Sequence, residues 1–498
     1  MSRQVVVSGW GQVTQPRTAS PPFGDPLDLM ETAARRAGEQ AGRGVLAQVD
    51  ALFVVRPQSR VLDAPERALA ARLGLEPRVV RLSGIGGQVP QQFVNEAAGM
   101  LARGEARTVL ICGAETFYPR SASDQRGEGA LLQGIPPDYA ADDAVGATAL
   151  EADHGLTLPI HGFPLFENAL WAASGLSKAA WLARVGGLWA GFSAVAAAHP
   201  NAWTRTALDA GDIVTPAPDN RPIAYPYTKR MVSLVMADLG AAVILTTATR
   251  AAAARDGAGR AVYFRGGAWA RDRQRFLVER EDYTQSAALA RATARAEIRA
   301  GLGAGEIAAF DLYSCFPCAV NIQRRHLGLA DDDPRPLTQT GGLGFFGGPG
   351  SNYALHGIAS MAEAIAAGRH TSGMTTALGW FLHKFAVGIY ADTPNRRDIA
   401  ADDREDAAAP DAGNAPLEPA AAPRGVGIIE TWTVIFDRAQ RPACGIVYGR
   451  TAEGRRFVAN CADDDAAYAA FTGENVVGRR VALAPAVDGV RTLATLLA

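Results

Sequence analysis

The chain has 498 residues, of which 48% are hydrophobic and 20% are charged. Its 49 basic and 51 acidic side chains leave a net charge of −2, so composition provides no overall positive field for nucleic acid or an anionic membrane. At roughly 100–200 residues per domain, this length predicts two to four domains, each with its own core.

The five cysteines are sparse and odd in number, which argues against a disulfide framework. The N-terminal sequence MSRQVVVSGWGQ lacks the apolar region of a secretory signal. No apolar run approaches the length of about 18 residues that a membrane span requires. We therefore expect a cytoplasmic protein without a membrane span.

Short apolar runs alternate with helical patterns near the start of the chain. Asp25 followed by Pro26 is typical of a helix start, because proline is tolerated in the first turn. Buried strands that alternate with helices indicate α/β layers around a largely parallel sheet. The predicted strands are 5–9, 51–55, 79–82 and 107–112, and further helices are predicted at 66–73 and 90–103.

Residues 118–233 interrupt this alternation. The stretch is rich in proline and glycine and contains Trp171, Trp181, Trp189 and Trp203, and we predict a mostly helical insertion. A strand at 241–247 closes it, and the alternation then restarts in a similar order, which predicts two similar halves. The second half comprises strands at 261–267, 307–313, 374–379 and 384–391 and helices at 284–302, at 316–326 and from Ser351.

The C-terminal part differs in composition. Residues 392–424 are rich in Ala, Pro and Asp and have no hydrophobic periodicity, which predicts a linker. Beyond it, VGIIETWTVIF, GIVYGRT, RRFVANC and VVGRRVALAP are short strand signals and predict a small β barrel. Alternation places Ile428, Trp432, Val434 and Phe436 on one face. We thus divide the chain into 1–260, 261–391, the linker and 425–498.

The segment GGLGFFGGPGSNYALHG, residues 341–357, is the most distinctive candidate site, with seven glycines. Glycine lets the backbone approach a ligand closely, and Ser351 is placed to cap a following helix. Free N–H groups at a helix start would form an oxyanion or phosphate site. The alternative is a tight connection between a strand and a helix. The segment matches neither of the common glycine-rich nucleotide motifs.

Two further candidates carry reactive side chains. In DLYSCFPCAV, residues 311–320, Cys315 lies just before a helix that Pro317 would open, a position that lowers a thiol pKa. Cys315 and Cys318 form one C-x-x-C without a second pair, so zinc is not indicated, and inert buried cysteines are the alternative. ALGWFLHKFAVGIY, residues 377–390, places His383 and Lys384 beside a glycine between two strands.

These glycine-marked turns, together with RLSGIGGQVPQQF, VVVSGWG, ICGAET and MADLGAAVILTTA, resemble the thiolase superfamily over about residues 3–391. The sequence is most similar to sterol-carrier-type thiolases and to thiolase-like proteins with an additional C-terminal β domain. The resemblance implies two βαβαβ halves in α/β/α/β/α layers, a helical loop insertion and a small OB-like barrel. It also implies coenzyme A or its acyl esters as ligand, no other cofactor or metal, and a homodimer.

Several residues depart from the thiolase pattern. The nucleophilic cysteine corresponds to Gly87, and the histidine of Gly-His-Pro corresponds to Gly348. The sterol-carrier-type His-Asp-Cys-Phe becomes Tyr313-Ser314-Cys315-Phe316, so only Cys315 is retained. Acyl transfer needs a nucleophile, a base and an oxyanion site, so ordinary thiolysis at position 87 is excluded. The N–H groups of Gly86–Gln88 and of Gly347–Gly350 are left to bind a thioester oxygen.

Three functions follow from the resemblance. In the first, an acyl-CoA acyltransferase of acetyl-CoA acetyltransferase type works through Cys315, Tyr313 and His383. The second is a retro-aldolase acting on a 3-hydroxyacyl-CoA, with Tyr313 and Tyr353 as acid and base and the barrel in place of a partner protein. The third is a non-catalytic carrier of CoA esters. Contacts to the CoA phosphates are expected from Lys229, Arg230 and Lys384.

Overall fold

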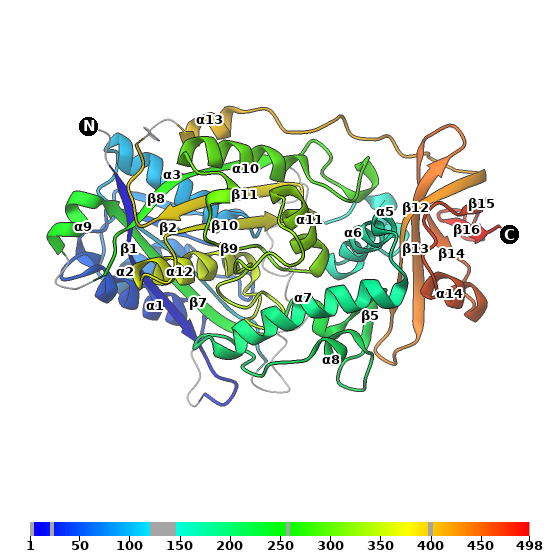
Figure 1. Cartoon of the computed structure of the whole chain (residues 1–498), viewed down its shortest axis with the longest axis horizontal. Helices are drawn as coiled ribbons and strands as arrows, with labels where there is room; N and C mark the ends of the chain where they lie inside the picture. Colours follow the sequence, from blue (N-terminus) through cyan, green and yellow to red (C-terminus); the bar gives the residue numbers. More distant parts are fainter. Residues whose placement is uncertain (1–3, 20–23, 120–145, 255–258, 397–401, 498) are drawn as a thin grey trace.

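A nine-stranded sheet forms the centre of the protein in the computed structural model, which describes residues 4–19, 24–119, 146–254, 259–396 and 402–497 (Figure 1). The strand order is β3-β2-β4-β7-β1-β8-β11-β10-β9. In chain order these strands are β1 (Val5–Thr14), β2 (Ala51–Val54), β3 (Val79–Leu82), β4 (Thr108–Thr116), β7 (Asp238–Thr247), β8 (Val262–Arg271), β9 (Ala309–Asp311), β10 (Ser372–Gly379) and β11 (Lys384–Ala391).

The order of the strands repeats between the two halves, as predicted. The first half runs β3-β2-β4-β7-β1, and the second runs β9-β10-β11-β8 with one edge strand fewer. Among the described residues of this sheet, only β2–β3, β2–β4 and β9–β10 pair in parallel, so the expectation of a largely parallel sheet was wrong. The other pairings are antiparallel; for example, the short turn from β10 to β11 permits only an antiparallel return.

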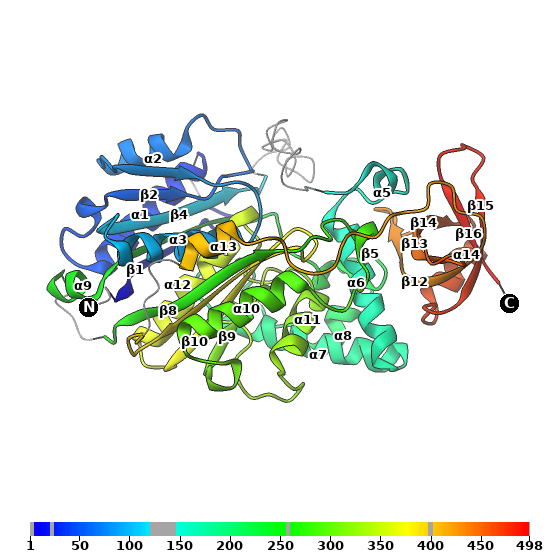
Figure 2. The same ribbon diagram turned by 90° about the horizontal axis from the view of Figure 1, so that it is seen from above.

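Helices form three layers around the two halves, which confirms the predicted α/β/α/β/α arrangement (Figure 2). The outer layer on the first half contains α1 (Pro26–Ala41) and α2 (Pro65–Leu73). The middle layer contains α3 (Val89–Arg103) and α12 (Tyr353–Ala366), which contact strands of both halves. On the outer face of the second half lies α10 (Ala287–Ala300), with α11 (Pro317–Leu327) beside it, while the short α9 (Ala248–Ala254) follows β7.

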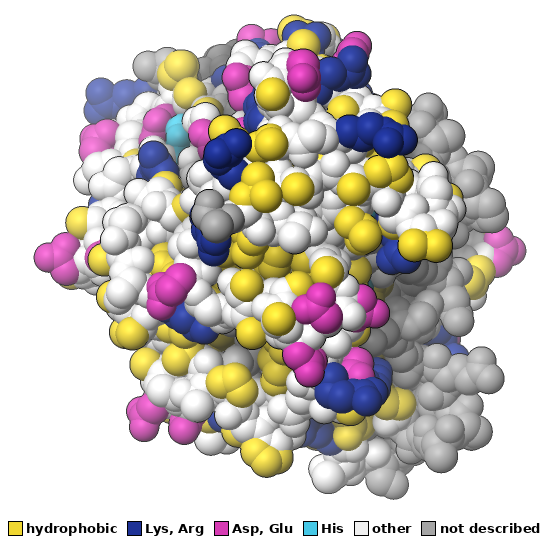
Figure 3. All heavy atoms as spheres, turned by 90° about the vertical axis from the view of Figure 1, so that its right-hand side faces the viewer, with side chains coloured by type: hydrophobic (Ala, Val, Ile, Leu, Met, Phe, Trp, Pro, Cys, Tyr) yellow, Lys and Arg dark blue, Asp and Glu magenta, His cyan; other side chains and the backbone are white. Residues whose placement is uncertain are grey.

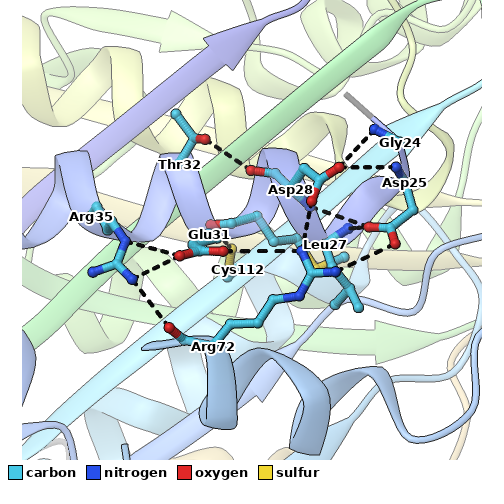
Figure 4. Close-up of polar contacts among 10 residues, drawn as sticks. Gly24, Asp25, Leu27, Asp28, Glu31, Thr32, Arg35, Arg72 and Cys112 are labelled. Atoms are coloured by element: carbon cyan, nitrogen blue, oxygen red, sulfur yellow. Dashed lines mark hydrogen bonds and ion pairs between the residues drawn. The ribbon is translucent and has the colours of Figure 1, made fainter. Parts of the chain in front are cut away.

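The start of α1 shows how local sequence fixes these elements (Figure 4). The Asp25 side chain accepts from the N–H groups of Leu27 and Asp28, and the Asp28 side chain accepts from the N–H of Asp25. This capping box satisfies N–H groups that a helix start leaves without partners. Arg72 of α2 donates to Asp28 at 2.7 Å, which ties the two outer helices together.

The insertion is mostly helical where it is described, as predicted, and residues 120–145 lie outside the described residues. It contains α5 (Ala149–Asp153), α6 (Pro159–Ser174), α7 (Lys178–Ala198) and α8 (Ala210–Val214), followed by the short strands β5 (Pro222–Ala224) and β6 (Tyr227–Thr228). Trp171, Trp181 and Trp189 are at most 2% exposed and belong to its hydrophobic core. Large aromatic side chains thus fill the insertion and fix how α6 and α7 pack.

The C-terminal region is a closed five-stranded barrel, as predicted, in the order β12-β13-β14-β16-β15 and back to β12. Its strands are β12 (Gly425–Phe436), β13 (Pro442–Thr451), β14 (Arg456–Cys461), β15 (Arg480–Pro485) and β16 (Thr492–Leu496). The sequence did not reveal β16 or helix α14 (Asp465–Thr472). Ile428 does not share the buried face of Trp432: an irregularity at Glu430 reverses the alternation, so Ile429 is buried and Ile428 is exposed.

The barrel and the insertion share one hydrophobic core. Trp432 of β12 packs against Trp171 and Tyr225, and Asn168 of α6 donates to the backbone carbonyls of Tyr225 and Trp432. Strand β12 also pairs with β5 through Ile435 and Ala224. These contacts are buried and mostly apolar, so the barrel is packed onto the rest of the protein.

The outer surface of the barrel shows no single sign of charge in the view of Figure 3, where basic and acidic side chains alternate with apolar ones. Among the described residues, no helix has the length and apolar character needed to cross a membrane.

Part of the expected linker is ordered by ion pairs. Helix α13 (Asp402–Ala408) lies on α3 and β8, whereas residues 397–401 are outside the described residues. The carboxylate of Asp406 is fully buried and accepts from Arg295, from Arg299 and from the N–H of Trp269. Farther along, Asp411 pairs with Arg271. This segment has little apolar surface, and charges hold it in place.

We expect Asp406→Ala to lower the free energy of unfolding by about 3–5 kcal/mol, because it leaves the buried Arg299 without its carboxylate. Glu405→Ala is the matched control: Glu405 pairs with the same arginine but is 65% exposed, so its loss should cost less than about 1 kcal/mol. Denaturant unfolding of both variants measures the difference. Equal losses would contradict the role given to the buried ion pair.

Candidate functional site

Three segments that are distant in sequence meet at Gly87. Gly87 lies in the turn between β3 and α3, Tyr313 follows β9, and Leu378 is near the end of β10. A Cβ placed on Gly87 would lie 2.6 Å from Tyr313 Cζ and closer still to Tyr313 Oη and to the carbonyl oxygen of Leu378. The space that a side chain at residue 87 would need is therefore occupied by the phenol of Tyr313.

Tyr313 is 5% exposed, and burial raises the pKa of its hydroxyl well above the usual range, with the nearby Cys315 adding to the rise. Its ring meets the ring of Tyr353 edge to face, with 5.5 Å between centroids. None of the hydrogen bonds among the described residues involves Tyr313 Oη. At neutral pH the site therefore presents a protonated phenol that is available to donate.

Tyr353, in contrast, is tied into a buried polar chain. Its hydroxyl lies 2.6 Å from Thr340 Oγ1, which in turn lies 3.4 Å from Oδ2 of Asp311. Asp311 Oδ2 also accepts from the N–H of Gln339, and burial raises the pKa of Asp311 to about 6. The Tyr353 hydroxyl is thus engaged in holding the glycine-rich segment beside β9.

The glycine-rich segment uses its own N–H groups internally. Gly348 donates to the carbonyl of Leu234, and Gly350 donates to the carbonyl of Gly348, both at 2.8 Å. A Cβ on Gly341 would overlap with Ala196 of α7. The segment is therefore a close-packed connection, and Gly348 and Gly350 do not provide the free donors expected of a cradle. Gly347 has φ +112°, a left-handed conformation that suits glycine.

Ser351 does not cap a helix, contrary to the prediction. Helix α12 begins at Tyr353, and Asn352 precedes it as N-cap residue without a side-chain cap. Ser351 Oγ instead accepts from the N–H of Gly86 at 2.9 Å and from Nε2 of Gln58 at 2.7 Å. The serine joins the first turn to the glycine-rich segment, and it also occupies one of the predicted backbone donors.

Gln88 was predicted as a site residue only for its backbone N–H group, and the structure shows that its side chain is also part of the site. Its Oε1 has no hydrogen-bond partner among the described residues, and the residue is 6% exposed. The side chain fills the space beside Gly86 and Gly379, where Cβ atoms would overlap with Oε1. The glycines at these positions make room for this amide next to Gly87.

The predicted activation of Cys315 was wrong in direction. The thiol lies just before Phe316, the N-cap residue of α11, and nearby backbone N–H groups do lower its pKa. Burial is the larger effect and raises the pKa of Cys315 well above its usual range. With 7% exposure, this cysteine is a protonated thiol rather than a ready nucleophile.

His383 closes the hairpin between β10 and β11. Trp380 and Leu382 in this hairpin have left-handed backbones, which are strained for residues with side chains. Three hydrogen bonds hold this hairpin in place. Arg280 donates to the carbonyl of Phe381, Ser286 donates to that of Leu382, and the N–H of Asp272 donates to that of His383.

The side chain of His383 is buried, and neither of its ring nitrogens has a hydrogen-bond partner among the described residues. Burial and the nearby positive charges, with Lys384 first, hold its pKa well below the usual range, so the imidazole is neutral. No described contact joins it to Tyr313 or Cys315. Lys384 is itself 3% exposed and does not offer its charge to a phosphate in solvent.

The two remaining basic candidates lie together in a single helical turn, Lys229–Met231. Arg230 is paired with Asp219 at 2.5 Å and donates to the carbonyl of Asp212. Lys229 is exposed, and no ion pair is described for it. The backbone that follows contacts the glycine-rich segment, since the N–H of Leu234 donates to the carbonyl of Leu343. Lys229 is thus the candidate best placed to meet a phosphate.

We expect Gly87→Ala to lower the free energy of unfolding by about 1–3 kcal/mol, because the new methyl group overlaps with Tyr313 and the Leu378 carbonyl. Gly187→Ala is the control: Gly187 lies on the exposed side of α7 with open space around it, so alanine should stabilise by about 0.5–1 kcal/mol. Chemical denaturation compares the two. A neutral Gly87→Ala would show that this space is not filled.

The chain is similar to known thiolase-like proteins in sequence and in structure. Residues 414–486 match the description "Thiolase-like protein type 1 additional C-terminal domain". A search of curated proteins finds no match. The structure is similar to the Ltp2-ChsH2(DUF35) aldolase, with TM-score 0.63 and 19% identity over 79% of this chain and 98% of that one. It is also similar to human mitochondrial 3-ketoacyl-CoA thiolase, with TM-score 0.55 and 14% identity over 78% and 99% of the chains.

A monomeric SCP2-thiolase-like protein type 1 from Mycobacterium smegmatis matches over the whole length. The TM-score is 0.81, and the two sequences are 31% identical over 100% of each chain. The chain therefore belongs to the thiolase-like proteins type 1, members of the thiolase superfamily that carry an additional C-terminal domain.

Proposed function

We propose that this protein binds a coenzyme A ester and that Tyr313, rather than a cysteine, faces the reacting carbon atoms. The observation that carries the proposal is the position of Tyr313 Oη, which fills the space a side chain at residue 87 would occupy. By resemblance to thiolases, that is the position of the nucleophile. The chemistry that a buried, protonated phenol supports at this point is proton donation.

Acyl transfer through Cys315 is less well supported. A covalent route requires a thiolate with a base beside it, and burial keeps the Cys315 thiol protonated. No described contact brings a base to the Sγ of Cys315, and His383 is fixed in the hairpin between β10 and β11. We therefore favour a reaction that needs no enzyme nucleophile.

Retro-aldol cleavage of a 3-hydroxyacyl-CoA meets these requirements. The C2–C3 bond breaks, the 3-hydroxyl loses its proton to solvent, C3 becomes a carbonyl, and C2 takes up a proton to give a shortened acyl-CoA. Tyr313 donates the proton to C2, and solvent, which took up the proton of the 3-hydroxyl, returns one to the phenolate. The raised pKa of Tyr313 keeps it protonated for this step. The likeness to an aldolase of the same fold supports this choice over thiolysis.

The barrel is connected to this site through two arginines. Arg456 of β14 donates to the carbonyl of Arg280, and Arg280 donates to the carbonyl of Phe381 in the hairpin that follows Leu378. The barrel would thus support the site from within the same chain. Since the relative from M. smegmatis is monomeric, we propose a monomer in place of the homodimer expected from sequence.

The test is binding followed by turnover with full-length protein. CoA, acetyl-CoA and a 3-hydroxyacyl-CoA are titrated by calorimetry, and carbon–carbon and thioester cleavage are then assayed. Tyr313→Phe should lower kcat for carbon–carbon cleavage by about 10²–10⁴-fold while leaving binding intact, because only the proton donor is removed. Cys315→Ala is the matched control and should retain turnover.

The opposite pattern, turnover lost in Cys315→Ala and kept in Tyr313→Phe, would contradict the proposal in favour of acyl transfer. Binding without any turnover would identify a carrier. No binding of CoA or its esters at millimolar concentration would overturn the ligand class as well.

A further inference from the structure

The backbone of Tyr313 is held on both sides by side chains. Its N–H donates to Oγ1 of Thr376 on β10 at 2.8 Å, and its carbonyl accepts from Nε2 of Gln323 on α11 at 2.8 Å. A proton donor needs its own hydroxyl for the substrate, so this hydroxyl cannot also serve to anchor the ring. The position of the phenol therefore depends on the backbone that carries it.

Thr376 and Gln323 provide these hydrogen bonds at the point where the sheet ends. Among the described residues, the backbone pairing of β9 with β10 reaches only Asp311 and Thr375, and Tyr313 lies two residues beyond it. Buried backbone N–H and carbonyl groups are costly unless they find a partner. At Tyr313 both partners come from side chains instead of from a neighbouring strand.

Thr376 and Gln323 also bind each other. The Thr376 hydroxyl donates to Oε1 of Gln323, and Nε2 of Gln323 also donates to the carbonyl of Ala319 in α11, at 2.8 Å. Both side chains are buried, and these contacts use every donor that a threonine and a glutamine side chain possess. A buried polar network whose members are all satisfied is rigid. The backbone of Tyr313 is therefore fixed between β10 and α11.

The strand that carries Thr376 also contributes to the space at Gly87. Leu378, two residues farther along β10, places its carbonyl oxygen in that space together with Tyr313 Oη. Strand β10 is buried along its whole length and pairs with β9 on one side and with β11 on the other. A single, well-supported strand thus fixes the phenol relative to the turn that contains Gly87.

We propose that Thr376 and Gln323 are positioning residues, which hold the phenol of Tyr313 at Gly87 through its backbone. The inference rests on the proposed function, in which Tyr313 donates a proton to C2, because a proton donor has to lie within hydrogen-bond reach of the atom that it protonates. A displacement of about 1 Å at a reacting group can lower a rate by about 100-fold. The loss of either positioning residue is therefore measurable in the rate.

Thr375 provides a matched control for Thr376. The two threonines are neighbours on β10 and are both 2% exposed. Successive side chains of a strand point to opposite faces, and the Thr375 hydroxyl donates to Oε1 of Gln91 in α3 at 2.6 Å. Valine at either position keeps the shape of the side chain and removes one buried hydroxyl. Only Thr376→Val removes a hydrogen-bond partner of Tyr313.

The first experiment measures carbon–carbon cleavage of a 3-hydroxyacyl-CoA by the full-length protein. Thr376→Val should lower kcat by about 10–100-fold and leave the Kd of the substrate unchanged, because a misplaced donor affects the transition state rather than binding. Thr376→Ser keeps a hydroxyl and should recover most of this loss, whereas Thr375→Val should have the kcat of the wild type. If Tyr313→Phe is inactive and Thr376→Val is as active as Thr375→Val, the proposal is overturned.

The second experiment is a double-mutant cycle that does not depend on turnover. Gly87→Ala should lower the denaturation midpoint, because Tyr313 occupies part of the space that the new methyl group needs. If Thr376 holds the phenol there, Thr376→Val lets Tyr313 move aside, and the shift caused by Gly87→Ala becomes smaller in that background. In the Thr375→Val background the shift should equal that of the wild type. Equal shifts in all three backgrounds would refute the proposal, whatever the turnover.

Variants of Gln323 decide the question if Thr376→Val does not fold. Gln323→Met removes the donor to the Tyr313 carbonyl at similar volume. Gln91→Met is its control, since Gln91 is equally buried but contacts the other face of β10. Gln323→Met should reduce the shift caused by Gly87→Ala, and Gln91→Met should not. If Tyr313→Phe keeps its turnover, the proposed function fails, and the cycle still decides whether these residues position the phenol.

Discussion

At Gly87 the space for a side chain is filled by the phenol of Tyr313, and the rest of the site depends on this contact. The Leu378 carbonyl closes the same space from the end of β10. Because both neighbours lie against the same Cα, residue 87 cannot carry a side chain unless Tyr313 or the strand moves. Glycine at residue 87 is thus required by the packing of the turn between β3 and α3.

The hairpin that follows Leu378 is held from both sides. Its strained residues, Trp380 and Leu382, persist because donors from the segment 272–286 fix three consecutive carbonyls. That segment is contacted in turn by the barrel through Arg456 and by the former linker through Asp411, which pairs with Arg275. The C-terminal domain is therefore part of the support for the site, and removing it would release a strained turn next to Gly87.

Much of the fold could be predicted from the sequence because hydrophobic runs and proline or glycine positions mark its elements. The starts of α1 and α11 at Pro26 and Pro317, the two-half order and the barrel follow from such local signals. Mixed strand direction, β16 and the reversal at Glu430 depend on pairing between distant segments, which local patterns do not record.

The site was predictable only in part. The glycine-rich turns and Tyr313 could be found from the sequence. The hydrogen bonds that occupy the glycine N–H groups could not, since their acceptors, Ser351 and Leu234, are remote in the sequence. The helix start correctly predicted that backbone N–H groups lower the pKa of the Cys315 thiol. The net shift in pKa is nevertheless upward, because burial outweighs these hydrogen bonds.

Burial favours the neutral form of the ionisable groups near α11, and this limits the chemistry that they can support. For Tyr313 and Cys315 it favours the neutral form, so the phenol remains a proton donor and the thiol is slow to ionise. Burial likewise raises the pKa of Glu167 of α6 to about 7, while hydrogen bonds from Tyr227 and from the backbone of Cys318 oppose the rise. A thiol that ionises poorly needs a base nearby to react at all. Glu167 interacts with the backbone of Cys318, inside α11, and no described contact brings a base to the Sγ of Cys315. Cys315 therefore stays protonated, which is consistent with the proton-donor role proposed for Tyr313.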